Sequence, residues 1–216
     1  MIKAETIFKY RIRLSKDANS ITTHEFRRVL KEALAASALP CASVKAGPRF
    51  NLAPGAQVGQ ASSSEYADIC LSQEESVENI NLKLSPFLKG GFRIEEIKEV
   101  PYSIASVENL ASYAKYLAKG ISGNIEKTAC AKKIEVEVEQ KNGMRLLLNI
   151  RPFIYSIKQT SGLEEVEIIV KLEVLRSIGL GQILAKLPGL EVKEKELFLE
   201  RIALLWQAKD GSLLAV

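Results

Sequence analysis

Apolar and charged residues alternate along residues 7–14, which is the pattern of a strand with one buried face. One face carries Tyr10, Ile12 and Leu14, and the other carries Lys9, Arg11 and Arg13. Residues 63–71 alternate in the same way, and their polar face carries Tyr66, Asp68 and Cys70. We therefore predict two strands, each with one face in the core and one charged or polar face.

A helical period separates these two stretches. Thr22 and Glu25 have the spacing of a capping box, in which each side chain accepts a hydrogen bond from the backbone amide of the other residue. The apolar residues that follow at helical spacing are Phe26, Val29, Leu30, Ala33 and Leu34. Pro40 then ends the predicted helix, because a proline disfavours helical backbone in the residue before it.

The first half of the chain continues as strand, strand, helix and strand. The second strand region, residues 41–60, is irregular because Gly-Pro and Pro-Gly pairs interrupt it. An amphipathic helix is predicted for residues 77–88 and a further strand for residues 92–102. The resulting β-α-β-β-α-β order is that of the split βαβ, or ferredoxin-like, fold.

The second half is predicted to be richer in strands. A helix over residues 106–118 leads to a domain boundary near residues 119–131. Asn142-Gly143 is a strong hairpin signal. Strands are predicted at residues 134–139, 144–157 with a bend at Pro152, 166–172, 197–206 and 213–216, and a short helix at residues 180–187. The predicted class is α+β, with a ferredoxin-like domain at residues 1–120 and a β-hairpin-rich domain at residues 121–216.

The composition is that of a soluble globular protein. Hydrophobic residues make up 47% of the 216 residues, and no apolar run is long enough for a transmembrane helix. The N-terminus lacks the apolar core of a signal peptide, so the expected location is the cytoplasm. A zinc site would need Cys41, Cys70, Cys130 and His24 to converge, and cysteine-held iron-sulfur clusters usually take four thiolates. We expect reduced thiols, no metal and no other cofactor.

Charge is uneven along the chain. Residues 1–50 carry ten Lys/Arg and four Asp/Glu residues, whereas residues 51–110 carry four and nine. A basic N-terminal segment can attract phosphate or an acidic protein surface. In the alternative interpretation, the basic and acidic segments fold against each other.

Four short motifs in the first half match one family. Its opening Arg-x-Arg-Phe-x-Lys strand is matched by Arg11-Ile12-Arg13-Leu14-Ser15-Lys16. Its helix start, Arg-rich helix and Leu-Pro end are matched by Thr22-Thr23-His24-Glu25, Arg28 and Leu39-Pro40. A loop and a final strand are matched by Gly47-Pro48-Arg49 and by Val58-Gly59, Ser62, Glu65, Tyr66, Asp68 and Leu71. Over roughly residues 5–120 the chain thus resembles the DUF2344 family, also called radical SAM-linked or radical SAM-associated proteins.

The resemblance implies an accessory role. Members look like partners, or fused appendages, of radical SAM proteins, and they lack the CxxxCxxC cluster motif of those enzymes, as this chain does. The family often neighbours ribonuclease E/G and ribosomal-protein genes, which implies an RNA or ribosome context. The expected partners are therefore a radical SAM protein and RNA or a ribosomal component, without a membrane.

Candidate binding residues lie on the charged strand faces, the first helix and the loop. They are Arg11, Arg13, Lys16, Arg28, Arg49, Tyr66 and Asp68. On an open sheet face, Arg11 and Arg13 could hold RNA phosphates or an acidic protein patch. In the alternative, Asp68 pairs with one of these arginines, because the first and third strands are neighbours in a ferredoxin-like sheet.

Three functional hypotheses stay open from the sequence. The first is a non-catalytic accessory protein that presents RNA or a ribosomal component to a radical SAM enzyme. The second is an enzyme acting on RNA with Asp68 or Glu65 in a cleft between the halves, although alternation points these two carboxylates to opposite faces. The third is a plain protein-interaction scaffold. No P-loop, GxGxxG, HExxH or GxSxG motif assigns a catalytic residue.

Overall fold

The computed structural model describes residues 6–18, 22–45, 47–139, 143–162 and 164–216. The fold is mixed α and β and separates into two compact units. The first comprises Met1–Ala111 with Val216, and the second comprises Ser112–Ala215. The chain therefore passes from one unit to the next after Ala111, a little before the boundary that the sequence suggested.

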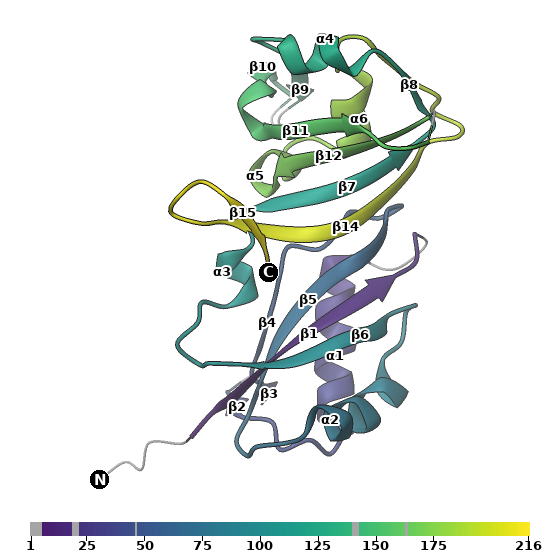
Figure 1. Cartoon of the computed structure of the whole chain (residues 1–216). Coiled ribbons are helices and arrows are strands. Elements are labelled where there is room, and N and C mark those ends of the chain that lie inside the picture. Colours follow the sequence, from purple (N-terminus) through teal and green to yellow (C-terminus); the bar gives the residue numbers. More distant parts are fainter. Residues whose placement is uncertain (1–5, 19–21, 46, 140–142, 163) are drawn as a thin grey trace. The chain divides into compact units, whose positions relative to one another are not determined.

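The first unit contains an antiparallel sheet in the order β4-β5-β1-β6 (Figure 1). Its strands are β1 (Phe8–Lys16), β4 (Phe50–Leu52), β5 (Ala61–Leu71) and β6 (Arg93–Val100). A short hairpin of β2 (Ser43–Val44) and β3 (Gly47–Pro48) precedes β4. The pairing of β1 with β5, expected from the strand order of a ferredoxin-like sheet, brings these two strands together in the middle of the sheet.

Two helices, α1 (Thr23–Ala36) and α2 (Val77–Leu84), cover one face of this sheet. The core between them contains Tyr10, Ile12 and Leu14 of β1, Ala67, Ile69 and Leu71 of β5, and Phe26, Leu30, Ala33 and Leu34 of α1. The predicted alternation and the predicted helical stripe are therefore both confirmed. The expected helix over residues 77–88 stops earlier, because Pro86 falls in a 3₁₀ turn, Ser85–Phe87, after α2.

The ends of α1 are fixed by side chains close in sequence. The predicted capping box is present: Thr22 N donates to Glu25 Oε2 at 2.9 Å and Glu25 N donates to Thr22 Oγ1 at 3.2 Å. These hydrogen bonds to the carboxylate lower the pKa of Glu25. At the other end, Ala38 takes a left-handed conformation with φ of 54°, which stops the helix before Pro40.

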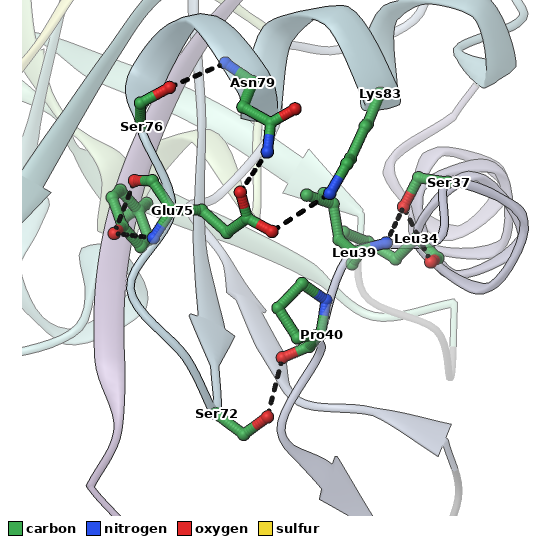
Figure 2. A network of polar contacts seen from close by, with 10 residues as sticks. Leu34, Ser37, Leu39, Pro40, Ser72, Glu75, Ser76, Asn79 and Lys83 are labelled. Carbon is green, nitrogen blue, oxygen red and sulfur yellow. Dashed lines mark hydrogen bonds and ion pairs between the residues drawn. The ribbon is translucent and has the colours of Figure 1, made fainter.

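Figure 2 shows the polar contacts that follow the C-terminal end of α1 and those around α2. Ser72 Oγ donates to Pro40 O at 3.0 Å and so connects the segment after α1 to the end of β5. The carboxylate of Glu75 accepts hydrogen bonds from Lys83 Nζ, at 3.0 Å, and from the Asn79 side chain, and both lower its pKa. The link from β5 into α2 is thus anchored by the helix that it precedes.

The second unit contains five strands that pair antiparallel in the order β11-β12-β7-β14-β15. Its strands are β7 (Tyr113–Lys119), β11 (Ile154–Gln159), β12 (Glu165–Lys171), β14 (Phe198–Gln207) and β15 (Leu213–Ala215). Two further pairs are β9 (Glu135–Glu139) with β10 (Arg145–Asn149), and β8 (Ile121–Gly123) with β13 (Leu190–Val192). The helices are α4 (Ile125–Cys130), α5 (Leu172–Leu175) and α6 (Leu180–Ala185). No helix in the part of the chain that the structure describes is long and apolar enough to cross a membrane.

The expected helix over residues 106–118 is wrong. Only α3 (Val107–Leu110) is helical, and the rest forms strand β7. Ala114, Tyr116 and Ala118 are buried at every second position, because β7 lies between β12 and β14. The apolar residues of this segment fit both the helical period and the strand period of two. Pairing with strands far away in the sequence selects the strand.

The expected long strand over residues 144–157 is also corrected. Pro152 lies in a 3₁₀ turn, Arg151–Phe153, that divides the segment into β10 and β11. Strands β9 and β10 do form a hairpin, as the Asn142-Gly143 signal predicts. Asn142 itself lies outside the described residues.

Candidate functional site

Lys9, Arg11 and Arg13 of β1 and Asp68 of β5 lie on the sheet face opposite α1 and α2. Strand register places Arg11 opposite Asp68, Arg13 opposite Tyr66, and Lys9 opposite Cys70. Asn51 of β4 is paired with Asp68 from the other side of β5. The cross-strand alternative considered for Asp68 is therefore confirmed, with Arg11 as its partner.

Arg11 and Asp68 form a buried ion pair with two contacts. Arg11 Nε donates to Asp68 Oδ1 at 2.8 Å, and Arg11 Nη2 donates to Oδ2 at 3.1 Å. The side chains are 4% and 0% exposed. Asp68 Oδ2 also accepts a hydrogen bond from Val107 N at 2.9 Å, and Arg11 Nη2 donates to Ala105 O at 3.1 Å. Further hydrogen bonds of this kind are what makes a buried ion pair tolerable.

Residues 101–107, which we call the strap, cover this part of the face. Lys9 is buried, and its ammonium donates to Tyr102 O at 3.4 Å and to Ile104 O. Together with the Arg11 and Asp68 contacts, this fixes the strap through its backbone at four residues. The expectation of an open basic face is therefore corrected at Lys9 and Arg11, whose charges hold the strap.

Arg13 lies farther along β1, where the face is more open. Its guanidinium is partly exposed and donates to Glu96 Oε2 at 3.1 Å across the β1–β6 pair. Tyr66 is opposite Arg13 and buried. Arg13 keeps partial access to solvent and also donates from Nη1 to Ser63 O at 3.5 Å, and its exposed ion pair with Glu96 contributes little stability.

Arg49 and Tyr102 combine a cation with a half-exposed aromatic ring. The Arg49 guanidinium carbon lies 5.5 Å from the centroid of the Tyr102 ring, and Lys9 Nζ lies 5.9 Å from it. Tyr102 is 49% exposed. Arg49 is fixed by its backbone, because Arg49 N donates to Ala42 O at 2.8 Å and Cys70 N donates to Arg49 O at 3.1 Å.

Arg49 keeps its charge available. No carboxylate within the described ranges forms an ion pair with the Arg49 guanidinium. A second cation lies over a ring on the helix side of the sheet, where the Arg27 guanidinium carbon of α1 is 5.7 Å from the centroid of Phe50. The Arg49 guanidinium is therefore held over an aromatic ring and not by an acidic side chain.

Two cysteines border this region and are poor nucleophiles. Burial raises the pKa of Cys41 to about 11. Burial also raises the pKa of Cys70, and the nearby Arg49 only partly offsets this. In the described part of the chain, no cluster of His, Cys, Asp and Glu residues is arranged to hold a metal ion.

The other predicted residues lie apart from Arg49 and Tyr102. Lys16 is buried and donates to Ala56 O at 3.0 Å. Glu65 is buried and accepts a hydrogen bond from Ala56 N at 3.1 Å. Arg28 is exposed on α1, on the opposite side of the sheet, and pairs with Glu32 at 2.9 Å. The structure thus brings Arg11, Arg49 and Asp68 to one region, with Arg13 and Tyr66 adjacent on the same face.

Sequence analysis missed Tyr102 and the strap, and with them the burial of Lys9. The available signal was the row of cations on β1, which needs acceptors when it is buried. Those acceptors are backbone carbonyls about ninety residues away along the chain, so no local pattern identifies them.

Comparison with curated proteins finds no match. A family model described as "Uncharacterized protein conserved in bacteria (DUF2344)" matches residues 9–183. The match covers β1, the strap and most of the second unit, and so includes both the charged face and the Arg49 segment. The chain therefore belongs to the DUF2344 family.

Proposed function

We propose that this protein is an accessory protein for a radical SAM enzyme and binds RNA, or a ribosomal or other protein partner, through the first unit. The observation that carries this proposal is the Arg49 guanidinium over the half-exposed Tyr102 ring. A guanidinium held by an aromatic ring keeps its hydrogen-bond donors available for a phosphate. An exposed aromatic ring offers a surface on which an unpaired base can stack.

This arrangement favours single-stranded RNA over a double helix. Proteins that recognise RNA sequences mostly contact unpaired bases and the adjacent phosphates. Arg49 and Arg13 would contact phosphates, and Tyr102 would contact a base. Arg11 and Asp68 would act indirectly, by holding the strap that carries Tyr102. Arg11 could contact a ligand directly only if the strap moved away.

We also infer that the first unit is ferredoxin-like. Its support is the order β4-β5-β1-β6, with every neighbouring pair antiparallel and both long helices on one face. In such a sheet a ligand can bind on the face away from the helices, and here the strap that carries Tyr102 lies on that face.

The association with a radical SAM enzyme comes from the family resemblance. This chain has no CxxxCxxC motif, so the radical chemistry would belong to the partner. The task of this chain would then be to bind and position the substrate. Catalysis by Asp68 is less well supported, because both of its oxygens are already occupied by Arg11 and Val107.

The test is purification of the tagged full chain from its native host, followed by sequencing of bound RNA and mass spectrometry of bound proteins. We expect Arg49→Glu and Tyr102→Ala to lose the bound RNA or partner. The matched control is Arg176→Glu, which reverses an exposed arginine in the second unit. If both variants retain the same RNA and proteins as the unmodified chain, the proposal is wrong.

A further inference from the structure

The β9–β10 hairpin of the second unit exposes apolar side chains on a strand with an unpaired edge. Leu146 and Leu147 of β10 are 51% and 65% exposed. Within the described residues, β10 pairs with β9 and with no other strand. Exposed leucines beside unpaired backbone amides and carbonyls favour pairing with another strand.

The two edges of the hairpin differ in charge. Strand β9 carries Glu135 and Glu137, whereas β10 carries Arg145, three leucines and Asn149. If two copies of the chain paired through β9, glutamates would face glutamates, and like charges directly opposite each other are destabilising. β10 carries no carboxylate, and its one charged residue, Arg145, pairs with Glu137 of the same hairpin at 3.2 Å.

We propose that β10 is an interface through which the chain pairs with β10 of a second copy in antiparallel orientation. A two-fold axis at Leu147 would place this residue opposite the same residue of the second copy. Leu146 would then face Leu148, and Arg145 would face Asn149. The leucine pairs are apolar, and Arg145 lies opposite the uncharged Asn149, so no pair brings like charges together. The strand is therefore complementary to itself, as a two-fold interface requires.

The fold of the hairpin supports this pairing. An isolated two-stranded hairpin is only marginally stable in water, and it gains stability from further strands or from packing against other elements. Val136 on β9 is buried, which anchors one side of the hairpin in the second unit. Pairing through β10 would join two hairpins into a four-stranded antiparallel sheet and cover Leu146 and Leu147. This interface lies away from Arg49 and Tyr102 in the sequence and is independent of the proposed RNA binding.

Sedimentation equilibrium of the full chain over a range of concentrations tests the proposal. We expect a species of twice the 23.8 kDa chain mass. Leu147→Arg should raise the dimer dissociation constant at least about tenfold, because it places two cations opposite each other. The control is Leu82→Arg, since Leu82 is 74% exposed on α2 and should leave the dimer unchanged. A monomer at every concentration, or a dimer that Leu147→Arg leaves intact, overturns the proposal.

A cross-linking experiment tests the register directly. Directly opposite residues of antiparallel strands have Cβ atoms about 5 Å apart, within reach of a disulfide after a small adjustment. Leu147→Cys, in a Cys130→Ser background that removes the exposed native thiol, should form a covalent dimer under mild oxidation. Leu82→Cys in the same background should not. A non-covalent dimer without this cross-link would place the interface elsewhere and overturn the proposal.

Discussion

Arg11 of β1 and Asp68 of β5 lie directly opposite each other and form a buried ion pair with two hydrogen bonds, at 2.8 and 3.1 Å. The same pair binds the strap through Ala105 O and Val107 N. Charges that the sequence suggested as a ligand-binding face therefore pair inside the fold and hold the segment that carries Tyr102.

Removing one partner of the pair should destabilise the protein strongly. Asp68→Ala leaves the Arg11 guanidinium buried without its carboxylate, which costs about 3–5 kcal/mol in comparable buried pairs. The double variant Arg11→Met/Asp68→Leu should be less destabilised than Asp68→Ala, because no buried charge remains. Urea unfolding of all three proteins measures this. Glu32→Ala, which breaks an exposed pair with Arg28, is the control and should unfold like the wild type. An Asp68→Ala protein as stable as this control would contradict the account.

Loss of Asp68 should also release the strap. Val107 N donates to the Asp68 carboxylate, so its amide should exchange slowly with solvent in the wild type. In Asp68→Asn, which keeps the size of the side chain, exchange at Val107 should be faster while amides in α1 keep their protection. Hydrogen exchange followed by NMR or mass spectrometry measures both. Unchanged protection at Val107 would show that the carboxylate does not hold the strap.

Tyr10 should contribute stability through its hydroxyl as well as its ring. The hydroxyl donates to Glu75 O at 2.8 Å and accepts from Glu75 N at 3.0 Å, and the side chain is buried. Tyr10→Phe should cost about 1–3 kcal/mol, because two backbone groups lose their partner. Chemical denaturation measures the difference, and Tyr155→Phe, at an exposed tyrosine, is the control. Equal stability of both variants would argue against this hydrogen bond.

Cys41 should make the fold sensitive to alkaline pH. Burial raises its pKa in the folded state from the ordinary 9.0 to about 11, so the folded protein keeps the thiol proton to higher pH than the unfolded chain. The stability from this difference is complete below about pH 9 and is lost as the pH rises through about 11. Cys41→Ser should therefore lose less stability over this range than the wild type, while Cys130→Ser, at an exposed thiol, should behave like the wild type. Thermal unfolding between these two pH values is the measurement, and parallel curves for Cys41→Ser and wild type would contradict it.

The regular parts of the fold follow from local patterns. Apolar and polar residue types alternate along β1 and the second half of β5, and the Thr22–Glu25 capping box together with the stripe from Phe26 to Leu34 defines α1. The strand β7 does not follow, because Tyr113 and Ala114 fit a helical stripe equally well and only pairing with β12 and β14 selects the strand.

The candidate site could be predicted only in part. Arg49 was identified from its loop, and the pairing of Asp68 with an arginine followed from strand order. The burial of Lys9 and Arg11 could not be predicted, because the carbonyls that accept their hydrogen bonds belong to the strap. A charged strand face looks the same in sequence whether solvent or a distant segment covers it. Tyr102 gains its place beside Arg49 through the same long-range contact.

The most direct test of the central claim is titration of the full chain with a fluorescent single-stranded RNA at several salt concentrations. The account predicts that Arg49→Gln weakens binding at least about tenfold and reduces the salt dependence of log K by roughly one unit per log unit of salt, while Arg176→Gln leaves both unchanged. Equal affinity and equal salt dependence for Arg49→Gln and the wild type would contradict the account.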